Sequence, residues 1–202
     1  MRNFVAVRGI RNLLHFTQIS NLPSILQHGI VPRRSLEAAQ APFKFNDFYR
    51  YDGYLNASCF TIGWPNYKMF YPLRLADPAV KWAVIECRPD ILWDKHCIFS
   101  ATNAASGIAR AIGEVQRTGV PGIAAMFAEA PGKPTREQMR LRHDFPTDPQ
   151  AEVLVCDVVE PAYFVRVHVH DTAERAALAG AYPMVNFDTG WEGYRSDFEH
   201  WR

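Results

Sequence analysis

The segment at residues 149–155 constrains the fold most, because it places one carboxylate at the start of an apolar strand. It reads P-Q-A-E-V-L-V, and Glu152 is followed at once by three aliphatic residues. Residues 140–149 are mostly polar and include two prolines, which is typical of a surface loop. An ionised carboxylate is rarely buried without a partner or a function. Glu152 is therefore either a solvent-facing residue of an edge strand or a carboxylate that a loop delivers to a functional site.

Further apolar runs predict a sheet of several short strands. We expect strands at residues 12–17, 57–62, 81–87, 152–159, 163–168 and 182–187. Helices are predicted at residues 20–29, at residues 103–117 and from residue 171 onward. Residues 32–56 lack a clean period and are expected to form a long ordered loop.

Capping residues and apolar spacing define two of these helices. Gly29 is expected to end the first helix. Asn103 can cap the second, which then carries Ile108, Ile112 and Val115 on one face.

Strands and helices do not alternate as βαβ units, which favours an α+β fold over a doubly wound sheet. With 202 residues and no linker or repeat, the chain is expected to form a single domain, 1–202.

Several common kinds of site are excluded by motifs that the sequence lacks. It contains neither G-x-G-x-x-G nor a P-loop motif, so Rossmann and P-loop nucleotide binding are not indicated. The four cysteines are isolated, so we expect no metal site and no disulfide framework. A net charge of +1 identifies no class of partner. No signal-peptide core or stretch of transmembrane length is present, so we expect a cytoplasmic protein without a membrane partner.

His15 and Thr17 close the first predicted strand in the sequence H-F-T. A histidine in an apolar strand is commonly a satisfied core residue. Here it precedes a helix whose N-terminal amides can hold an anion. Phe16, between the two polar residues, can stack on an aromatic ring. The alternative to core packing is therefore a dinucleotide site without a Rossmann fold.

Arg50 lies in the aromatic loop N-D-F-Y-R-Y-D-G-Y at residues 46–54. The tyrosines of this loop can stack on bases, and Asp47 or Asp52 can orient the guanidinium. A loop held by its own aromatic rings, with a surface Arg–Asp pair, is the structural alternative. In the segment W-P-N-Y-K-M-F-Y, Lys68 either covers apolar surface with its stem or pairs with a phosphate.

Five of these segments together resemble the DarT-type DNA ADP-ribosyltransferase toxins, which are distantly similar to the poly- and mono-ADP-ribosyltransferases. The segments are L-L-H-F-T, I-S-N-L-P-S-I-L-Q-H-G-I, N-D-F-Y-R-Y-D-G, P-N-Y-K-M-F-Y and T-D-P-Q-A-E-V-L-V, in that order. The resemblance implies an α+β fold with an ADP-ribosyltransferase-like split mixed or antiparallel β-sheet core and flanking helices. It also implies NAD+ as co-substrate and transfer of ADP-ribose to a base of single-stranded DNA, with release of nicotinamide.

The resemblance also assigns roles to individual residues. Glu152 corresponds to the transferase glutamate and Arg50 to the loop arginine that acts on the base, so both are expected to be catalytic. His15 corresponds to the histidine that holds the NAD+ ribose, and Phe16 and Thr17 to the nicotinamide end. The other residues expected to bind NAD+ are Asn21 in the helix motif and Lys68 and Tyr71 in the second-strand motif. Residues 133–150 are implied to recognise the substrate.

The chemistry of the transfer suits these residue types. Breaking the nicotinamide–ribose bond builds positive charge on the sugar, and a carboxylate at Glu152 stabilises that charge in the transition state. A guanidinium stays protonated, so Arg50 is poorly suited as a general base. We expect it instead to stabilise negative charge on the base as its proton leaves.

The acceptor and the partners are less constrained. The loop and P-N-Y-K-M-F-Y segments look closer to the guanine-modifying branch, so guanine is expected ahead of thymine. The resemblance implies a macrodomain antitoxin that removes the modification, and we expect a monomer. An RNA or protein acceptor is the first alternative. The second is an inactive nucleic-acid-binding module of the same fold, which the joint presence of His15, Arg50 and Glu152 argues against.

Overall fold

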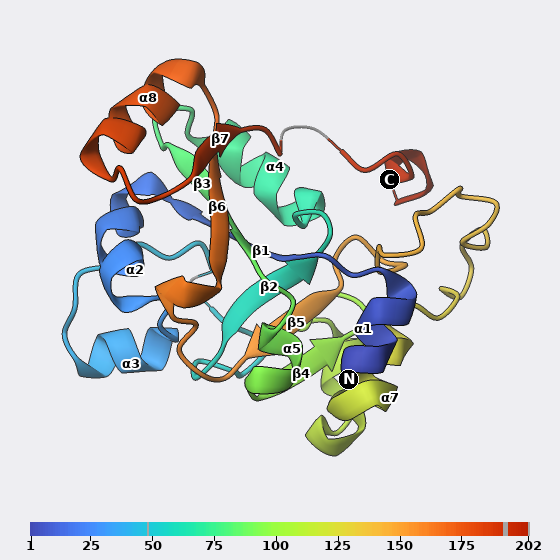
Figure 1. Cartoon of the computed structure of the whole chain (residues 1–202). Helices are drawn as coiled ribbons and strands as arrows, with labels where there is room; N and C mark the ends of the chain where they lie inside the picture. Colours follow the sequence, from blue (N-terminus) through green and yellow to red (C-terminus); the bar gives the residue numbers. More distant parts are fainter. Residues whose placement is uncertain (48, 192–193, 202) are drawn as a thin grey trace.

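The computed structural model describes residues 1–47, 49–191 and 194–201, which form a seven-stranded sheet with flanking helices (Figure 1). The strand order is β4-β5-β2-β1-β3-β6-β7. Neighbouring strands are antiparallel except β6 and β7, which are parallel. The strands are β1 (Leu13–Gln18), β2 (Ser58–Ile62), β3 (Trp82–Cys87), β4 (Cys97–Ser100), β5 (Glu152–Val155), β6 (Phe164–Val169) and β7 (Phe187–Thr189).

Helices cover both faces of this sheet. The α-helices are α1 (Arg2–Arg8), α2 (Leu22–His28), α3 (Arg33–Ala38), α4 (Tyr67–Ala76), α5 (Ile91–Asp94), α6 (Gly107–Arg110), α7 (Gly119–Ala125) and α8 (Thr172–Ala181). The 3-10 helices are η1 (Ile19–Asn21), η2 (Glu114–Arg117), η3 (Pro161–Tyr163) and η4 (Phe198–Trp201). In these described ranges, no helix has the length and apolar composition needed to cross a membrane.

Two apolar cores hold the layers together. The larger core joins side chains of α1, α2, α5 and α7 to one face of the sheet, around Ile85 and Val153. On the other face, Phe70 of α4 packs with Leu14 and Trp82. This burial places α4 against β1 and β3, as Figure 1 shows.

The sheet splits between β1 and β2. In the described part of the chain, these two strands pair at Leu13–Ile62 and Leu14–Thr61 alone. Beyond Leu14, β1 continues to pair with β3, while the other half of β2 pairs with β5. The two strands therefore diverge and leave space between them. The expected split mixed sheet is confirmed.

Glu152 does not lie on an edge strand. Its strand β5 is flanked by β4 on one side and β2 on the other, and Glu152 is paired with Ser100 of β4. The edge-strand interpretation is therefore wrong, because the sheet continues on both sides. The strand also ends at Val155, short of the predicted residue 159.

Most of the other predicted strands are confirmed. Strands β1, β2, β3 and β6 lie within one residue of their predicted bounds. The last strand was placed too early, because β7 begins at Phe187, where the predicted strand ends. Strand β4, with the sequence C-I-F-S, was not predicted, since four residues carry too little periodic signal.

The predicted helix at residues 103–117 is wrong. This region forms α6 and η2, with Gly113 between them. Ser106, rather than Asn103, caps α6 through its side-chain oxygen. Ile108 and Val115 are 75% and 87% exposed, so the apolar spacing that suggested a buried helix face has nothing to pack against.

Two further segments differ from expectation. The predicted loop at residues 32–56 contains the short helix α3, and Phe48 of its aromatic motif lies outside the described residues. The motif with Lys68 and Tyr71 follows the second strand but forms helix α4. Asn66 caps this helix, its Oδ1 accepting the Met69 N–H at 3.2 Å.

Candidate active site

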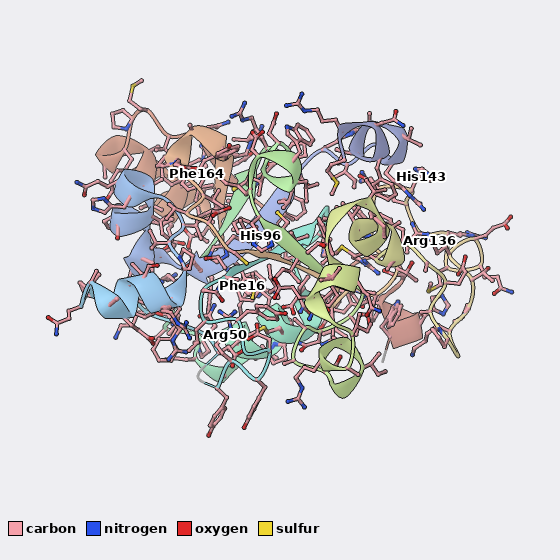
Figure 2. The ribbon with its side chains drawn as sticks, turned by 90° about the horizontal axis from the view of Figure 1, so that it is seen from below. Phe16, Arg50, His96, Arg136, His143 and Phe164 are labelled. Atoms are coloured by element: carbon pink, nitrogen blue, oxygen red, sulfur yellow. The ribbon has the colours of Figure 1, made fainter. Side chains whose placement is uncertain are left out.

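A cavity opens where β1 and β2 diverge. It is enclosed by β1, by η1 and α2, by the loop that follows α3, and by the starts of α4 and β5. Six of the eight predicted site residues line it: His15, Phe16, Thr17, Asn21, Arg50 and Glu152. In Figure 2, Phe16 and Arg50 are labelled close to each other near the middle of the view. The fold thus joins residues that are far apart in the sequence.

Glu152 is a buried carboxyl group at the wall of this cavity. It is 8% exposed, and its Oε2 accepts the backbone N–H of Ala104 at 2.7 Å. Burial is the main effect and raises the pKa of Glu152 to about 7. The nearby Asp52 charge also raises this pKa, whereas the Ala104 N–H and the Arg50 charge lower it. The group therefore exchanges its proton near neutral pH, unlike an ordinary glutamate.

His15 presents a hydrogen-bond acceptor to the cavity. Its Nδ1 lies 2.9 Å from the backbone oxygen of Cys59, and a carbonyl oxygen only accepts. Burial lowers the pKa of His15, against the effect of that hydrogen bond, so the ring is neutral with its proton on Nδ1. The unprotonated Nε2 is then suited to accept a hydrogen bond from a hydroxyl group.

Asn21 fixes the wall of the cavity. Its Nδ2 donates to Thr17 Oγ1 at 3.0 Å and to the backbone oxygen of Lys44 at 2.8 Å, while its Oδ1 accepts the Lys44 N–H at 2.8 Å. Both amide hydrogens are used by the protein itself. Asn21 thus joins β1 to the loop after α3, and its predicted role in NAD+ binding stays a prediction.

Arg50 is held by its own loop. Its Nε and Nη2 donate to the Asp52 carboxylate, Nη1 donates to the Ala57 oxygen at 3.1 Å, and Nη2 also donates to the Tyr54 oxygen. These bonds use four of the five N–H groups, which leaves one on Nη1 among the described residues. Burial lowers the pKa of Arg50, but the negative charge around it, with the hydrogen-bonded Asp52 carboxylate foremost, outweighs burial and raises that pKa above the ordinary value.

Two exposed tyrosine rings flank Arg50 in the chain. Tyr49 and Tyr51 are 68% and 62% exposed, and their rings stack on each other at 5.1 Å between centroids. Rings that are this exposed can stack on bases, as the sequence predicts for this loop. The alternative, in which the rings pack inward to hold the loop, does not describe these two residues.

Lys68 and Tyr71 do not line the cavity. Lys68 Nζ donates a hydrogen bond to the backbone oxygen of Trp201, and the Tyr71 ring lies 5.1 Å from that of Tyr194. Both side chains therefore attach the C-terminal segment to α4. The structure does not bring them together with the other predicted site residues.

The loop at residues 133–150 also contributes nothing to the described cavity lining. Arg136 and His143 lie toward the right edge of the view in Figure 2, away from Arg50. Phe145 anchors the loop against Trp64, with ring centroids 6.4 Å apart. Substrate recognition by this loop stays a prediction.

The structure adds polar groups that sequence reasoning missed. Thr61 Oγ1, Asn66 Nδ2 and Asn46 Oδ1 belong to cavity-lining residues, are buried and have no hydrogen-bond partner in the described part of the protein. Asn66 directly precedes α4, so its N-cap position was the one signal available in the sequence. Unpaired buried polar atoms around a cavity are suited to hydrogen-bond a ligand.

The Cys59 thiol is poorly suited to nucleophilic chemistry. Cys59 lines the cavity, and burial raises the pKa of its thiol far above the ordinary value, so it stays protonated. Among the described residues, no group of three or more His, Cys, Asp or Glu side chains could hold a metal ion.

A protein-family model described as "ssDNA thymidine ADP-ribosyltransferase, DarT" matches residues 14–197. This range contains every predicted site residue. A comparison with curated proteins gives no match.

Solved structures share the fold. A structure of Thermosipho africanus DarTG in complex with ADP-ribose is 18% identical, with a TM-score of 0.62, and the match covers 89% of this chain and 50% of that one. Thermus sp. 2.9 DarT in complex with ADP-ribosylated ssDNA is 13% identical, with a TM-score of 0.57 and coverage of 92% and 97%. Its complex with NAD+ is 15% identical, with a TM-score of 0.54 and coverage of 91% and 98%. The chain thus spans half of the Thermosipho protein and nearly all of the Thermus protein.

Proposed function

The chain belongs to the DarT family of single-stranded DNA ADP-ribosyltransferases, and from this premise we propose that it transfers ADP-ribose from NAD+ to a base of single-stranded DNA. The observation that carries the proposal is the convergence of His15, Arg50 and the buried Glu152 on one cavity. The structures of Thermus sp. 2.9 DarT with NAD+ and with ADP-ribosylated ssDNA support the same donor and acceptor for this fold.

Glu152 is proposed as the catalytic carboxylate. When the bond from nicotinamide to C1″ of the ribose breaks, its electron pair leaves with nicotinamide and positive charge develops on the sugar. An ionised Glu152 facing that charge stabilises the transition state more than the ground state. A base nitrogen then bonds to C1″ and loses its proton. Because its pKa lies near 7, Glu152 can receive that proton, directly or through water.

His15 and the residues around it are proposed to hold NAD+. The neutral His15 can accept a hydrogen bond from a ribose hydroxyl through Nε2. Phe16 and Thr17 line the same cavity at the proposed nicotinamide end. Lys44 also lines it and supplies positive charge suited to a pyrophosphate. Arg33 lines it too, with its Nε paired with the Glu37 carboxylate at 2.6 Å.

Arg50 is proposed to stabilise charge rather than to remove a proton. Its guanidinium stays protonated, so it cannot act as a general base. The second Nη1 N–H, which has no partner among the described residues, can donate to an oxygen of the base as negative charge develops there. Exposed Tyr49 and Tyr51 offer rings on which neighbouring bases can stack.

Thymidine is the acceptor that we propose. The description of the matching family model names thymidine, and no comparison supports the guanine preference expected from the sequence. An RNA or protein acceptor stays the runner-up, because the cavity itself does not distinguish the polymer. A single domain, a monomeric state and a macrodomain antitoxin that removes the modification are part of the same proposal.

Mass spectrometry of nucleosides tests the proposal. Single-stranded DNA is incubated with the protein and NAD+, digested to nucleosides, and searched for the mass of ADP-ribosylated thymidine or deoxyguanosine. Parallel reactions contain RNA or bulk protein, and Glu152→Gln serves as the inactive control. We expect modified thymidine with the parent alone. Label from NAD+ in RNA or protein, but not in DNA, would assign a different acceptor. No NAD+ consumption with single-stranded DNA present would support the inactive module.

A further inference from the structure

A second cavity lies on the α4 face of the sheet. It is bounded by α4, by the residues before and within β3, by the end of β6, and by the segment after β7. The side chains that matter here are Phe70, Arg74, Lys81, Trp82, His168 and Trp191. Predicted roles in NAD+ binding and catalysis involve none of them.

The polar atoms around this cavity include several donors that lack acceptors. Trp82 Nε1, Trp191 Nε1 and Arg74 Nε are buried and have no hydrogen-bond partner among the described residues. Trp82 as a whole is only 8% exposed. Indole and guanidinium N–H groups can donate but cannot accept. An unpaired buried donor costs about 1–3 kcal/mol, and an acceptor-rich ligand bound against these side chains would relieve that cost. His168 Nδ1 is a further buried atom without a partner in the described part of this wall.

The charge at the cavity favours an anion. Arg74 and Lys81 line it, and the described lining contains no acidic side chain. Lys81 pairs with Asp171 at 3.7 Å on an exposed surface and also lies near Glu174, so its charge acts on these carboxylates as well as on the cavity. Glu86 lies behind His168, but its oxygens are already bound by His168 Nε2 at 3.1 Å and Asn12 Nδ2 at 2.8 Å.

Aromatic rings form the other part of the wall. Phe70, Trp82 and Trp191 all line the cavity, and the Arg74 guanidinium lies 4.9 Å from the Phe70 ring centroid. Aromatic rings of this kind stack on bases of any sequence. A ligand that combines a flat ring with an acceptor-rich anion has the chemistry of a nucleotide.

Phe16 connects this cavity to the active-site cavity. Its ring lines the active-site cavity and stacks on Phe70 at 4.7 Å, with the Trp82 ring 6.2 Å away. One aromatic layer therefore separates the two cavities. This shared wall makes the second cavity a candidate site for a nucleotide that neighbours the target base.

We propose that the second cavity binds a nucleotide of single-stranded DNA that flanks the modified base, with its phosphate on Arg74 and Lys81 and its base against Trp82 and Trp191. The inference rests on the proposed function. It places a determinant of the preferred DNA motif outside the catalytic cavity.

Binding of fluorescein-labelled oligonucleotides tests the proposal. The strands carry one target base and increase in length on either side, and Glu152→Gln protein prevents turnover. Affinity is expected to rise about tenfold when the flanking nucleotide is included, and Arg74→Gln is expected to remove that rise. Arg74→Gln should also lower the slope of log K against log salt by about 0.7, whereas Trp191→Leu should remove the rise and keep the slope.

Matched controls separate this site from general attraction. Arg175→Gln removes the same charge from an exposed position on α8 and should keep both the rise and the slope. Lys81→Gln, at a side chain that is 53% exposed, repeats the charge test without disturbing the core. A parent-like length dependence in Arg74→Gln, Lys81→Gln and Trp191→Leu would overturn the proposal. Tight binding of free thymidine monophosphate without any length dependence would overturn it too.

Transfer by the parent protein is measured on the same strands. If the parent modifies DNA and the variants bind the strands as the parent does, the second cavity is wrongly assigned and the proposed function stands. Absence of both modification and oligonucleotide binding means that the proposed function has failed, and this inference with it.

Discussion

The Oε2 atom of Glu152 accepts the backbone N–H of Ala104 at 2.7 Å, inside a wall where the carboxyl group is almost fully buried. One neutral donor only partly offsets the loss of hydration, so the pKa of Glu152 stays raised, at about 7. The same hydrogen bond holds the carboxyl group in one orientation. The residue is thus positioned by the fold, and close to neutral pH it is present in both its protonated and its ionised form.

The first prediction concerns the pH dependence of transfer. If ionised Glu152 is required, kcat/KM for NAD+ rises about tenfold per pH unit below its pKa and levels off above about pH 7. Initial rates of nicotinamide release with saturating single-stranded DNA measure this profile. A rate already constant down to about pH 5 would contradict the assignment, because an ordinary glutamate is ionised there.

The second prediction concerns stability of Glu152→Gln. The folded protein keeps a proton that the unfolded chain releases between about pH 4.5 and 7, so the parent loses stability as pH rises through that window. Glutamine does not titrate and can still accept the Ala104 N–H. Relative to the parent, the variant should therefore gain about 3 kcal/mol between about pH 4.5 and pH 8. Urea unfolding at both pH values measures this gain; an unchanged difference would mean that the pKa is not raised.

The parts of the site that lie on one segment were predictable from the sequence, and the parts that depend on packing were not. H-F-T and Q-A-E are local patterns whose polar residues interrupt apolar strands, so His15, Thr17 and Glu152 stand out. Asn66 became part of the site only because β1 and β2 diverge beside it, and no spacing in the sequence reports that divergence.

Apolar spacing predicted a helix wrongly where the folded protein has no surface that buries those apolar side chains. Ile108, Ile112 and Val115 follow a helical period, yet Gly113 interrupts the helix and the side chains face solvent. The segment with Lys68 shows the opposite case, because the resemblance assigns it to a strand motif and the structure forms a helix there. The Asn66 cap and the burial of Phe70 favour that helix.

The third prediction concerns Arg50→Lys. A lysine cannot contact the Asp52 carboxylate and the carbonyls of Ala57 and Tyr54 together, because it lacks the planar fork. Transfer is expected to fall by about 10²-fold or more, with a loss of about 1–3 kcal/mol in unfolding free energy. Steady-state rates and urea unfolding check the two effects. Arg110→Lys, at an exposed position on α6, is the control, and full activity of Arg50→Lys would rule out a role for the guanidinium geometry.

The fourth prediction compares two glycines. Gly29 ends α2 with φ of +87°, and a Cβ there would lie 2.5 Å from the Val159 oxygen, so Gly29→Ala combines backbone strain with a collision. We expect it to destabilise the fold by about 2–4 kcal/mol and to raise KM for NAD+, because Gly29 and Ile30 line the active-site cavity. Gly180 lies within α8 with nothing near its Cβ position, so Gly180→Ala should stabilise by about 0.5–1 kcal/mol. Thermal unfolding of both variants is the measurement. If Gly29→Ala raised the unfolding temperature as Gly180→Ala does, the backbone at Gly29 would relax. The Ile30–Val159 bridge would then not fix the wall of the cavity.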